Sequence, residues 1–371
     1  MLLKTISYFF ILIIVWEYSL QSNPYIIAAS LPLWFFIKSP FPIKQNTIYF
    51  IISVAFLTLF FLIMNIFHEH ISYQKLHDSY IFKIIYINYI VILLLLFYSD
   101  KIDLLQKSIN FALFVCIIVF YFQTIVYYTT GTYIDFLEPI TGVSQRYQMY
   151  FSAADLIRPT SLFNEPGSYA AGTLPLLILS YLTEKKLTKL HIFTLLSYYL
   201  SFSFFAIIEA TLFIFTVVML KYDFKLSLKN ISIIFLLFSM LSIVTIGLND
   251  YIKLRTDPSK KQVAGISQRS HILKYWLSLD SKNILWGQGF AQTKFKSYVT
   301  EDNGLAFKLI FEYGITSFPM FAFIFFISWG QALFFTFILL LTKLTYLTYD
   351  FWFYLVSLYL LKPYFRKKNN K

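Results

Sequence analysis

Residues 46–67 read NTIYFIISVAFLTLFFLIMNIF. This run contains no charged residue. A run of about 18 apolar residues or more indicates a membrane-crossing α-helix, and this run is longer. Strands of a membrane β-barrel alternate apolar and polar residues, whereas this run does not alternate. The stretch therefore predicts a transmembrane helix, and similar runs recur along the chain.

The composition supports the same class for the whole chain. Only 13% of the 371 residues are charged, whereas 58% are hydrophobic and 21% are aromatic. Soluble domains carry about 25% charged residues, so we expect an all-α polytopic membrane protein that forms one integral membrane domain over residues 1–371. The single cysteine, Cys116, lies in an apolar run and excludes a disulfide framework. The N-terminal stretch MLLKTISYFFILIIVW predicts a retained first span, because no small-residue cleavage site follows it.

The apolar runs predict about twelve transmembrane helices. They lie near residues 2–20, 24–38, 46–67, 81–98, 108–128, 166–183, 190–202, 204–220, 231–248, 304–328, 330–344 and 346–361. The run 190–220 is too long for one ordinary helix, and Ser201 and Ser203 predict a tight turn within it. Two polar stretches, about 129–165 and about 249–303, interrupt the series.

The positive charges of the short loops predict the orientation, because cytoplasmic loops are enriched in lysine and arginine. With a cytoplasmic N-terminus, the following positive segments all fall inside: Lys38 and Lys44, Lys101 and Lys107, the loop TEKKLTK, Lys221 to Lys229, and the tail KPYFRKKNNK. Both termini are then cytoplasmic. The two long polar stretches become outer loop one (129–165) and outer loop two (249–303).

Arginine is concentrated in these outer loops. Of the five arginines, only Arg366 lies elsewhere; the others are Arg146, Arg158, Arg255 and Arg269. A guanidinium binds phosphate or carboxylate in a two-pronged geometry and keeps its charge, which indicates an anionic ligand, with phosphate the first candidate. The alternative is that the arginines contact lipid headgroups or pair with the acidic residues Asp135, Asp155, Asp250 and Asp257.

The segment RPTSLFNEPGSYA, residues 158–170, is a charged interruption between apolar runs. Pro159 and Pro166 prevent a continuous helix, and Pro166 suits the first turn of the next span. Glu165 then lies at the N-terminal end of that span, where the helix dipole favours its charged form. Two interpretations follow: an Arg158–Glu165 clasp that closes a re-entrant loop, or an anion-binding arginine beside a general base.

Two further segments carry candidate groups. In SQRSHILKYWLSLDSKNILWGQGF, residues 267–290, Arg269, His271 and Lys274 are close in sequence. We expect a helix that packs along the membrane surface through Trp276, Leu277 and Leu285, and that ends at Gly287 and Gly289. His271 is either a catalyst or a hydrogen-bonded surface residue. In EDNGLAFKLIFEYGI, residues 301–315, Glu301, Asp302 and Asn303 are either helix caps or acceptor-binding groups.

A metal site is a further possibility at HEHISYQKLH, residues 68–77. His68, Glu69, His70 and His77 are all of types that bind zinc, although their spacing matches no helical pair. A mobile polar loop explains the same residues, so we expect no metal. The sequence also lacks a Walker loop and a dinucleotide-binding glycine pattern.

The three segments together resemble a known family. R158-P-T-S-L-F-N-E-P-G-S-Y-A170 resembles the R-x-x-S-x-F-x-E-P segment of bacterial O-antigen and capsule repeat-unit polymerases, the Wzy family. R269-S-H-I-L-K-Y-W followed by G287-Q-G289 resembles the arginine-led outer-loop helix of that family and of O-antigen ligases. N303-G-L-A-F-K-L-I-F-E-Y-G-I315 is similar to their H-N-x-x-L…E-x-G-I segment, with Asp302 in place of the usual histidine.

The resemblance implies a GT-C-like fold in the bacterial cytoplasmic (inner) membrane and a metal-independent glycosyltransferase without a cofactor. Its substrates would be oligosaccharide repeat units linked to undecaprenyl pyrophosphate, joined into O-antigen or capsular polysaccharide at the outer face. Its partners would be membrane lipid and the chain-length regulator and flippase of the same pathway, with no nucleic acid. The implied catalytic residues are Glu165 as base, Arg158 and Arg269 on the pyrophosphate, and His271 as an alternative base. The implied substrate-binding residues are Arg146, Arg255, Asn164, Lys274, Asp302 and Asn303, of which Asp302 is also an alternative base.

Two other functions stay open. An O-antigen ligase would share the arginines but pass the glycan to lipid A core, and the absence of histidine before Asn303 disfavours it. A transporter or flippase of lipid-linked oligosaccharide would place ionisable residues inside spans, as Glu17 and Glu209 do.

Overall fold

The computed structural model describes residues 1–20, 23–37, 44–66, 74–147, 157–221, 274–289 and 304–369. These residues form helices and connecting segments, with no β-strand among them. In chain order the elements are α1 Leu2–Leu20, α2 Asn23–Trp34, α3 Gln45–Ile66, α4 Gln74–Tyr98, α5 Ile102–Thr130, α6 Glu138–Thr141, α7 Pro166–Glu184, α8 Lys189–Leu200, α9 Phe204–Lys221, α13 Ser281–Trp286, α14 Leu305–Tyr313, the 3₁₀ helix η3 Gly314–Ser317, α15 Phe318–Ile327, α16 Gln331–Leu340 and α17 Tyr349–Asn369.

Long apolar helices identify a membrane-embedded protein. Among the described residues, five helical segments are long and apolar enough to cross a bilayer: Gln45–Asn65, Ile81–Tyr98, Ile102–Thr130, Phe204–Lys221 and Leu305–Ile327. Large apolar side chains also remain exposed along one face of α3 and of α5. They are Ile48, Ile52, Phe56, Leu59 and Ile63 on α3, and Phe114, Ile118, Phe122 and Ile125 on α5. Such continuous exposed apolar faces are suited to contact with lipid.

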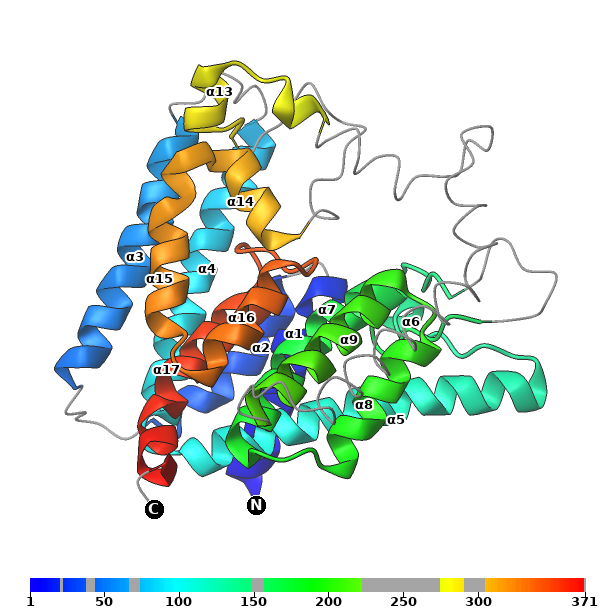
Figure 1. Cartoon of the computed structure of the whole chain (residues 1–371). Helices are drawn as coiled ribbons and strands as arrows, with labels where there is room; N and C mark the ends of the chain where they lie inside the picture. Colours follow the sequence, from blue (N-terminus) through cyan, green and yellow to red (C-terminus); the bar gives the residue numbers. More distant parts are fainter. Residues whose placement is uncertain are drawn as a thin grey trace, which may run out of the picture.

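Several predicted boundaries agree with the structure. Helices α1, α3 and α9 begin and end within two residues of the runs 2–20, 46–67 and 204–220. Helix α8 ends at Leu200 and α9 begins at Phe204, which confirms the tight turn predicted at Ser201 and Ser203. The start and the end of the described chain lie at the same end of the molecule (Figure 1). The predicted span 231–248 lies outside the described residues.

One predicted boundary differs in a way that matters for the site. The predicted span 330–344 is helical only to Leu340, and residues 341–348 form a non-helical turn before α17 that is buried from Thr342 onward. Threonine hydroxyls explain the break, because they bond locally to the backbone in competition with helical hydrogen bonds. Thr342 Oγ1 donates to the Leu339 carbonyl at 2.7 Å, and Thr348 Oγ1 donates to the Thr345 carbonyl at 2.7 Å.

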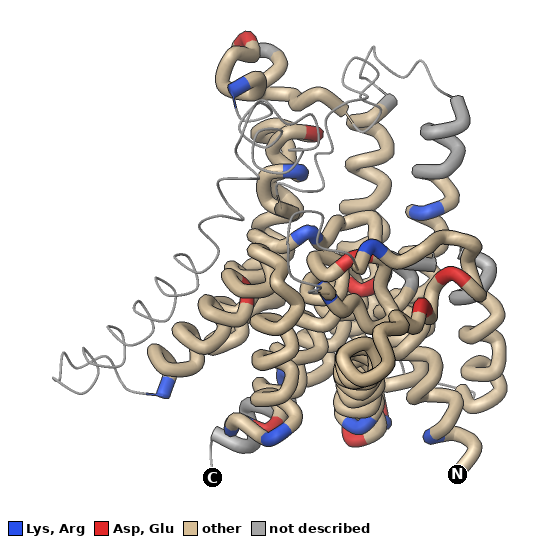
Figure 2. Tube along the Cα trace, turned by 90° about the vertical axis from the view of Figure 1, so that its right-hand side faces the viewer, with Lys and Arg blue, Asp and Glu red and all other residues tan. Residues whose placement is uncertain are grey.

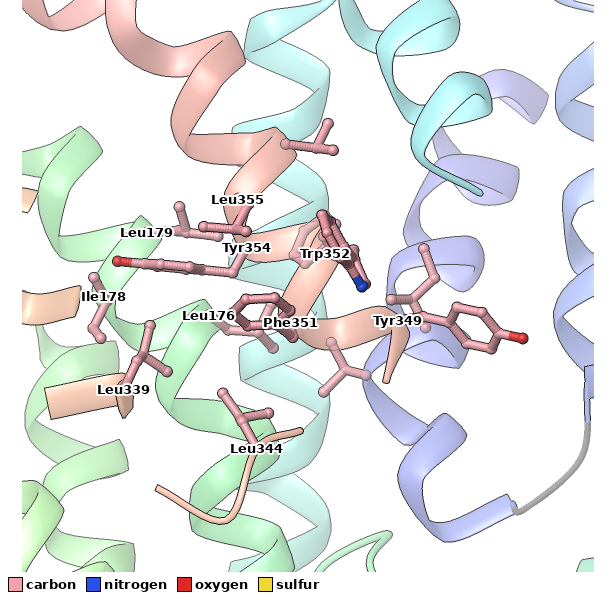
Figure 3. Packing of buried hydrophobic residues seen from close by; sticks show 14 of the residues in the cluster. Leu176, Ile178, Leu179, Leu339, Leu344, Tyr349, Phe351, Trp352, Tyr354 and Leu355 are labelled. Carbon is pink, nitrogen blue, oxygen red and sulfur yellow. The ribbon is translucent and has the colours of Figure 1, made fainter. Parts of the chain in front are cut away.

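Helix α7 lies at the centre of the bundle. All its residues from Pro166 to Thr183 are buried, and it packs against α1, α5, α8, α9, α16 and α17. Figure 3 shows Leu176, Ile178 and Leu179 of α7 beside the aromatic start of α17. Burial of this apolar surface removes α7 from lipid and fixes the position of its N-terminal end, where the segment 158–165 joins it.

Backbone contacts attach α13 to the α14–η3 corner. The Gln288 and Gly289 amides donate to the carbonyls of Phe311 and Glu312 at 2.9 and 2.8 Å. A Cβ atom on Gly287 would overlap the Glu312 carbonyl, and one on Gly314 would overlap the Ile284 carbonyl. The sequence predicts that α13 ends at Gly287 and Gly289. The same residues are where α13 packs against α14 and η3.

We expect Gly314→Ala to destabilise the protein more than Gly330→Ala. The two glycines have similar backbone angles (φ 57°, ψ −138° and φ 53°, ψ −128°), but the space at Gly330 is open. Gly330→Ala should cost about 1–3 kcal/mol from backbone strain alone, whereas Gly314→Ala must also displace α13. Thermal unfolding of the purified variants in detergent measures the difference. Equal losses would show that the docking of α13 contributes nothing to stability.

Candidate functional site

Two buried glutamines hold the segment 158–165 in its non-helical path. Gln145 Nε2 donates to the Ser161 and Phe163 carbonyls at 2.7 and 2.8 Å. The Gln123 side chain donates to the Ser161 carbonyl at 3.1 Å and accepts from the Ser161 amide at 2.8 Å. Ser161 has a φ of 56°, an uncommon conformation for serine. Because these backbone groups have partners away from water, the segment is stable without being helical.

The same segment lies beside residues 143–147, which places two arginines near Glu165. The Arg146 amide donates to the Asn164 carbonyl at 2.7 Å, and the Arg158 amide donates to the Tyr147 carbonyl at 2.7 Å. Asp135 fixes the start of the neighbouring segment by accepting from the Gln145 amide at 2.6 Å. The predicted residues Arg146, Arg158, Asn164 and Glu165 are therefore brought together.

Glu165 occupies the N-cap position of α7 and Pro166 follows at the first helical position, as predicted. Its close ion pair is with Lys343 of the turn 341–348, whose Nζ lies 2.7 Å from Glu165 Oε1. Arg146 Nη1 lies 4.0 Å from Glu165 Oε2. We call Arg146, Arg158, Glu165 and Lys343 the α7 charge cluster. Within this cluster Lys343 makes the short contact with Glu165, and the charges of Arg146 and Arg158 also act on that carboxylate.

Lys343 was absent from the predicted site residues. Its position in the sequence could have identified it as a candidate. It is a lone lysine near the connection between the last two predicted spans, and the predicted orientation places that connection on the outer side. Gly167 makes room for it, because a Cβ atom there would lie 3.3 Å from Lys343 Cε and Nζ. Thus the glycine and the proline that follow Glu165 serve the geometry of the ion pair as well as the start of the helix.

Exposure decreases from Arg146 to Lys343. The Arg146 side chain is 73% exposed, that of Glu165 is 25% exposed and that of Lys343 is 10% exposed. Three positive groups therefore surround one carboxylate, and the arginine at the surface is accessible to a ligand. Figure 2 shows basic and acidic residues gathered in the middle of the molecule, apart from the charges at its ends.

The surroundings of Glu165 act on its pKa in opposite directions. Burial raises the pKa, but the charge of Lys343 and its hydrogen bond, followed by the charges of Arg146 and Arg158, lower it below the usual range. A carboxylate in this state is ionised at neutral pH and accepts a proton poorly. While paired, Glu165 therefore holds Lys343 in place. Glu165 can act as a base only when its cationic partners bind another group.

The third motif positions the turn that carries Lys343. The Leu305 amide donates to the Thr342 carbonyl at 3.0 Å. Tyr346 Oη donates to Glu312 Oε2 at 2.5 Å and shares a 2.8 Å hydrogen bond with Tyr313 Oη. Glu312 also lies 4.0 Å from Lys308 Nζ, with both side chains buried. Glu312 and Tyr346 are structural supports of the site that were not among its predicted residues.

The other predicted residues lie elsewhere. Lys274 is exposed in a helical turn that precedes α13, and Figure 1 places α13 apart from the start of α7. Trp276, Leu277 and Leu285, predicted to face the membrane, are partly or largely exposed. Arg255, Arg269, His271, Asp302 and Asn303 lie outside the described residues, as does the candidate zinc segment at His68, Glu69 and His70; the His77 side chain is likewise not described.

We expect Lys343→Met to lower stability at neutral pH by about 1–3 kcal/mol, the usual cost of leaving a buried polar group without its partner. Because the pKa of Glu165 is lowered in the folded protein, the pair's contribution is complete above the usual glutamate pKa and is lost as the pH falls through the lowered value. The difference from wild type should therefore shrink in acid.

Thermal unfolding in detergent between neutral and acid pH measures this difference. Lys189→Met is the matched control, because Lys189 is exposed at the start of α8, and it should show no such pH dependence. A loss that stays constant with pH would mean that Lys343 stabilises the fold through packing alone.

Comparison with known proteins gives no match: no protein-family model, no curated protein and no solved structure is similar to the chain. The geometry of the α7 charge cluster therefore carries the functional proposal.

Proposed function

We propose that the protein is a glycosyltransferase of the bacterial cytoplasmic membrane that polymerises lipid-linked oligosaccharide repeat units. It would move the growing glycan from undecaprenyl pyrophosphate to a sugar hydroxyl of the next lipid-linked unit at the outer face. The observation that carries this proposal is the α7 charge cluster, in which Lys343, Arg146 and Arg158 surround Glu165 at a helix N-terminus.

The cluster fits an anionic leaving group. Guanidinium and ammonium groups bind phosphate oxygens through charge-assisted hydrogen bonds, and the positive end of α7 adds to their field. Stabilisation that strengthens as charge develops on the departing pyrophosphate lowers the barrier to transfer. Arg269 and Arg255 remain proposed contributors from the second outer loop.

The pairing of Glu165 suggests how a base would become available. Pyrophosphate that binds Lys343, Arg146 and Arg158 competes with Glu165 for these cations, and its negative charge raises the pKa of the freed carboxylate. Glu165 would then accept the proton of the acceptor hydroxyl. The acceptor oxygen forms the new bond to the anomeric carbon, and the bond from that carbon to the pyrophosphate oxygen breaks, with its electron pair leaving on the pyrophosphate. Thus the donor would prepare the base.

A transporter of lipid-linked oligosaccharide is the second candidate, and the burial of Glu209 within α9 favours it, since ionisable groups inside spans often mark transport pathways. An O-antigen ligase remains the third. The three functions leave different glycans in a cell, so one experiment separates them.

We expect deletion of the gene to leave lipid A core with a single repeat unit instead of a ladder of long glycans. Complementation with Glu165→Gln should fail to restore the ladder, because the amide cannot accept the proton. Arg158→Lys should restore little, because an ammonium lacks the two-pronged geometry. Glu138→Gln is the matched control, since Glu138 is an exposed glutamate of the same loop, and it should restore the full ladder at equal abundance.

The glycan gel and an extract of lipid-linked intermediates together decide the function. Bare core with accumulated lipid-linked polymer would identify a ligase. Loss of lipid-linked units from the outer leaflet would identify a transporter. A full ladder with Glu165→Gln at normal abundance would remove Glu165 from the mechanism.

A further inference from the structure

A second carboxylate lies within the bundle near the α7 charge cluster. Glu209 of α9 is 3% exposed, and neither of its carboxylate oxygens has a hydrogen-bond partner among the described residues. An ionised carboxylate without a partner is very costly in apolar surroundings. In this arrangement Glu209 therefore holds a proton.

Lys343 links this group to Glu165. While Lys343 Nζ contacts Glu165 at 2.7 Å, it also lies 5.9 Å from the centre of the Phe205 ring. Phe205 and Glu209 are four residues apart on α9 and so share one face of that helix. The charge of Lys343 acts on Glu209 from the turn 341–348, and Glu209 in turn acts on Tyr198 of α8. Helices α7, α8 and α9 pack against one another, and α16 packs against both α7 and α9, so the charge of one lysine acts on two carboxyl groups of neighbouring helices.

We propose that Lys343 pairs with these two carboxylates in turn, with Glu165 at the mouth of the site and with Glu209 in the bundle, and that Glu209 keeps a proton while Glu165 is ionised. The exchange deepens the proposed function, because a base that becomes neutral must release its lysine. The exchange rests on the proposed function only in one respect, namely that the proton taken up by Glu165 comes from the acceptor hydroxyl.

The physical reason is that a single lysine compensates a single negative charge. Once Glu165 is neutral and the pyrophosphate has left, the ionisable carboxyl group that remains near Lys343 is that of Glu209 on the neighbouring face. The long side chain of lysine turns toward it, the Glu209 O–H bond breaks, and its proton passes to water at the site entrance. Glu209 is thus a positioning residue that acts through Lys343 and keeps the lysine paired while Glu165 is neutral.

Carbodiimide labelling of the full-length protein in lipid nanodiscs tests this exchange, because the reagent N,N′-dicyclohexylcarbodiimide attacks protonated carboxyl groups in apolar surroundings. Mass spectrometry of peptides gives the extent of labelling at Glu209. We expect strong labelling in wild type and a several-fold decrease in Glu165→Gln, where Lys343 pairs with Glu209 and keeps it ionised. The double variant Glu165→Gln/Lys343→Met should regain the wild-type labelling, and Glu138→Gln should match wild type throughout.

Labelling that is unchanged in Glu165→Gln, or that is not regained in the double variant, would overturn the exchange. A second measurement covers the case in which Glu165→Gln does not fold. The infrared difference spectrum of wild type minus Glu209→Gln should contain the carbonyl stretch of a protonated carboxyl, and its absence would also overturn the proposal. Neither readout uses glycan synthesis, so a failure here is distinguishable from a failure of the proposed function.

Discussion

The ion pair between Glu165 and Lys343 is the contact on which the site depends. It joins residues 178 positions apart and connects the start of the buried helix α7 to the turn between α16 and α17. Its partners are a carboxylate 25% exposed and an ammonium 10% exposed, so water screens their attraction less than it screens a surface pair, which is worth little. The glutamines that hold segment 158–165 and the threonines that end α16 both serve to bring these two groups together.

The three sequence motifs are connected through this contact. The first contains Glu165, the third supplies Glu312 to Tyr346 of the lysine-bearing turn, and the described end of the second docks through Gln288 on the backbone of the third. Segments that are far apart in sequence therefore support one small region. The docking relies on backbone hydrogen bonds, which explains why glycine is required where α13 meets η3.

The sequence was informative wherever the cause of a structure is local. Pro166 predicts the start of α7 because its fixed φ and missing amide suit only the first turn, and the serines after Leu200 predict the turn before α9. The class of protein also follows from apolar run lengths alone. The break at residues 341–348 was missed because hydropathy continues through it, whereas the threonine hydroxyls that cause it contribute little to hydropathy.

Lys343, Gln123 and Gln145 could not be predicted for a different reason. Each acts through a partner brought near by the tertiary fold, and a single lysine or glutamine has no sequence spacing that identifies its partner. The same applies to Tyr346 of the turn before α17, whose hydroxyl donates a hydrogen bond to Glu312 of α14. The choice of arginine and the positions of the prolines therefore led to the region of the α7 charge cluster, while the long-range contacts within it required the structure.

The short length of α16 has a kinetic consequence. Ten residues rise about 15 Å, roughly half the hydrocarbon thickness of a bilayer, so the turn that carries Lys343 is reached by a helix too short for a full crossing and is almost fully buried. Burial of the turn limits the access of water to Lys343, whose side chain is 10% exposed. In the proposed glycan transfer the competing reaction is hydrolysis of the donor, and a sugar hydroxyl competes better with water where water is excluded. The short length of α16 would thus influence the ratio of glycan transfer to donor hydrolysis.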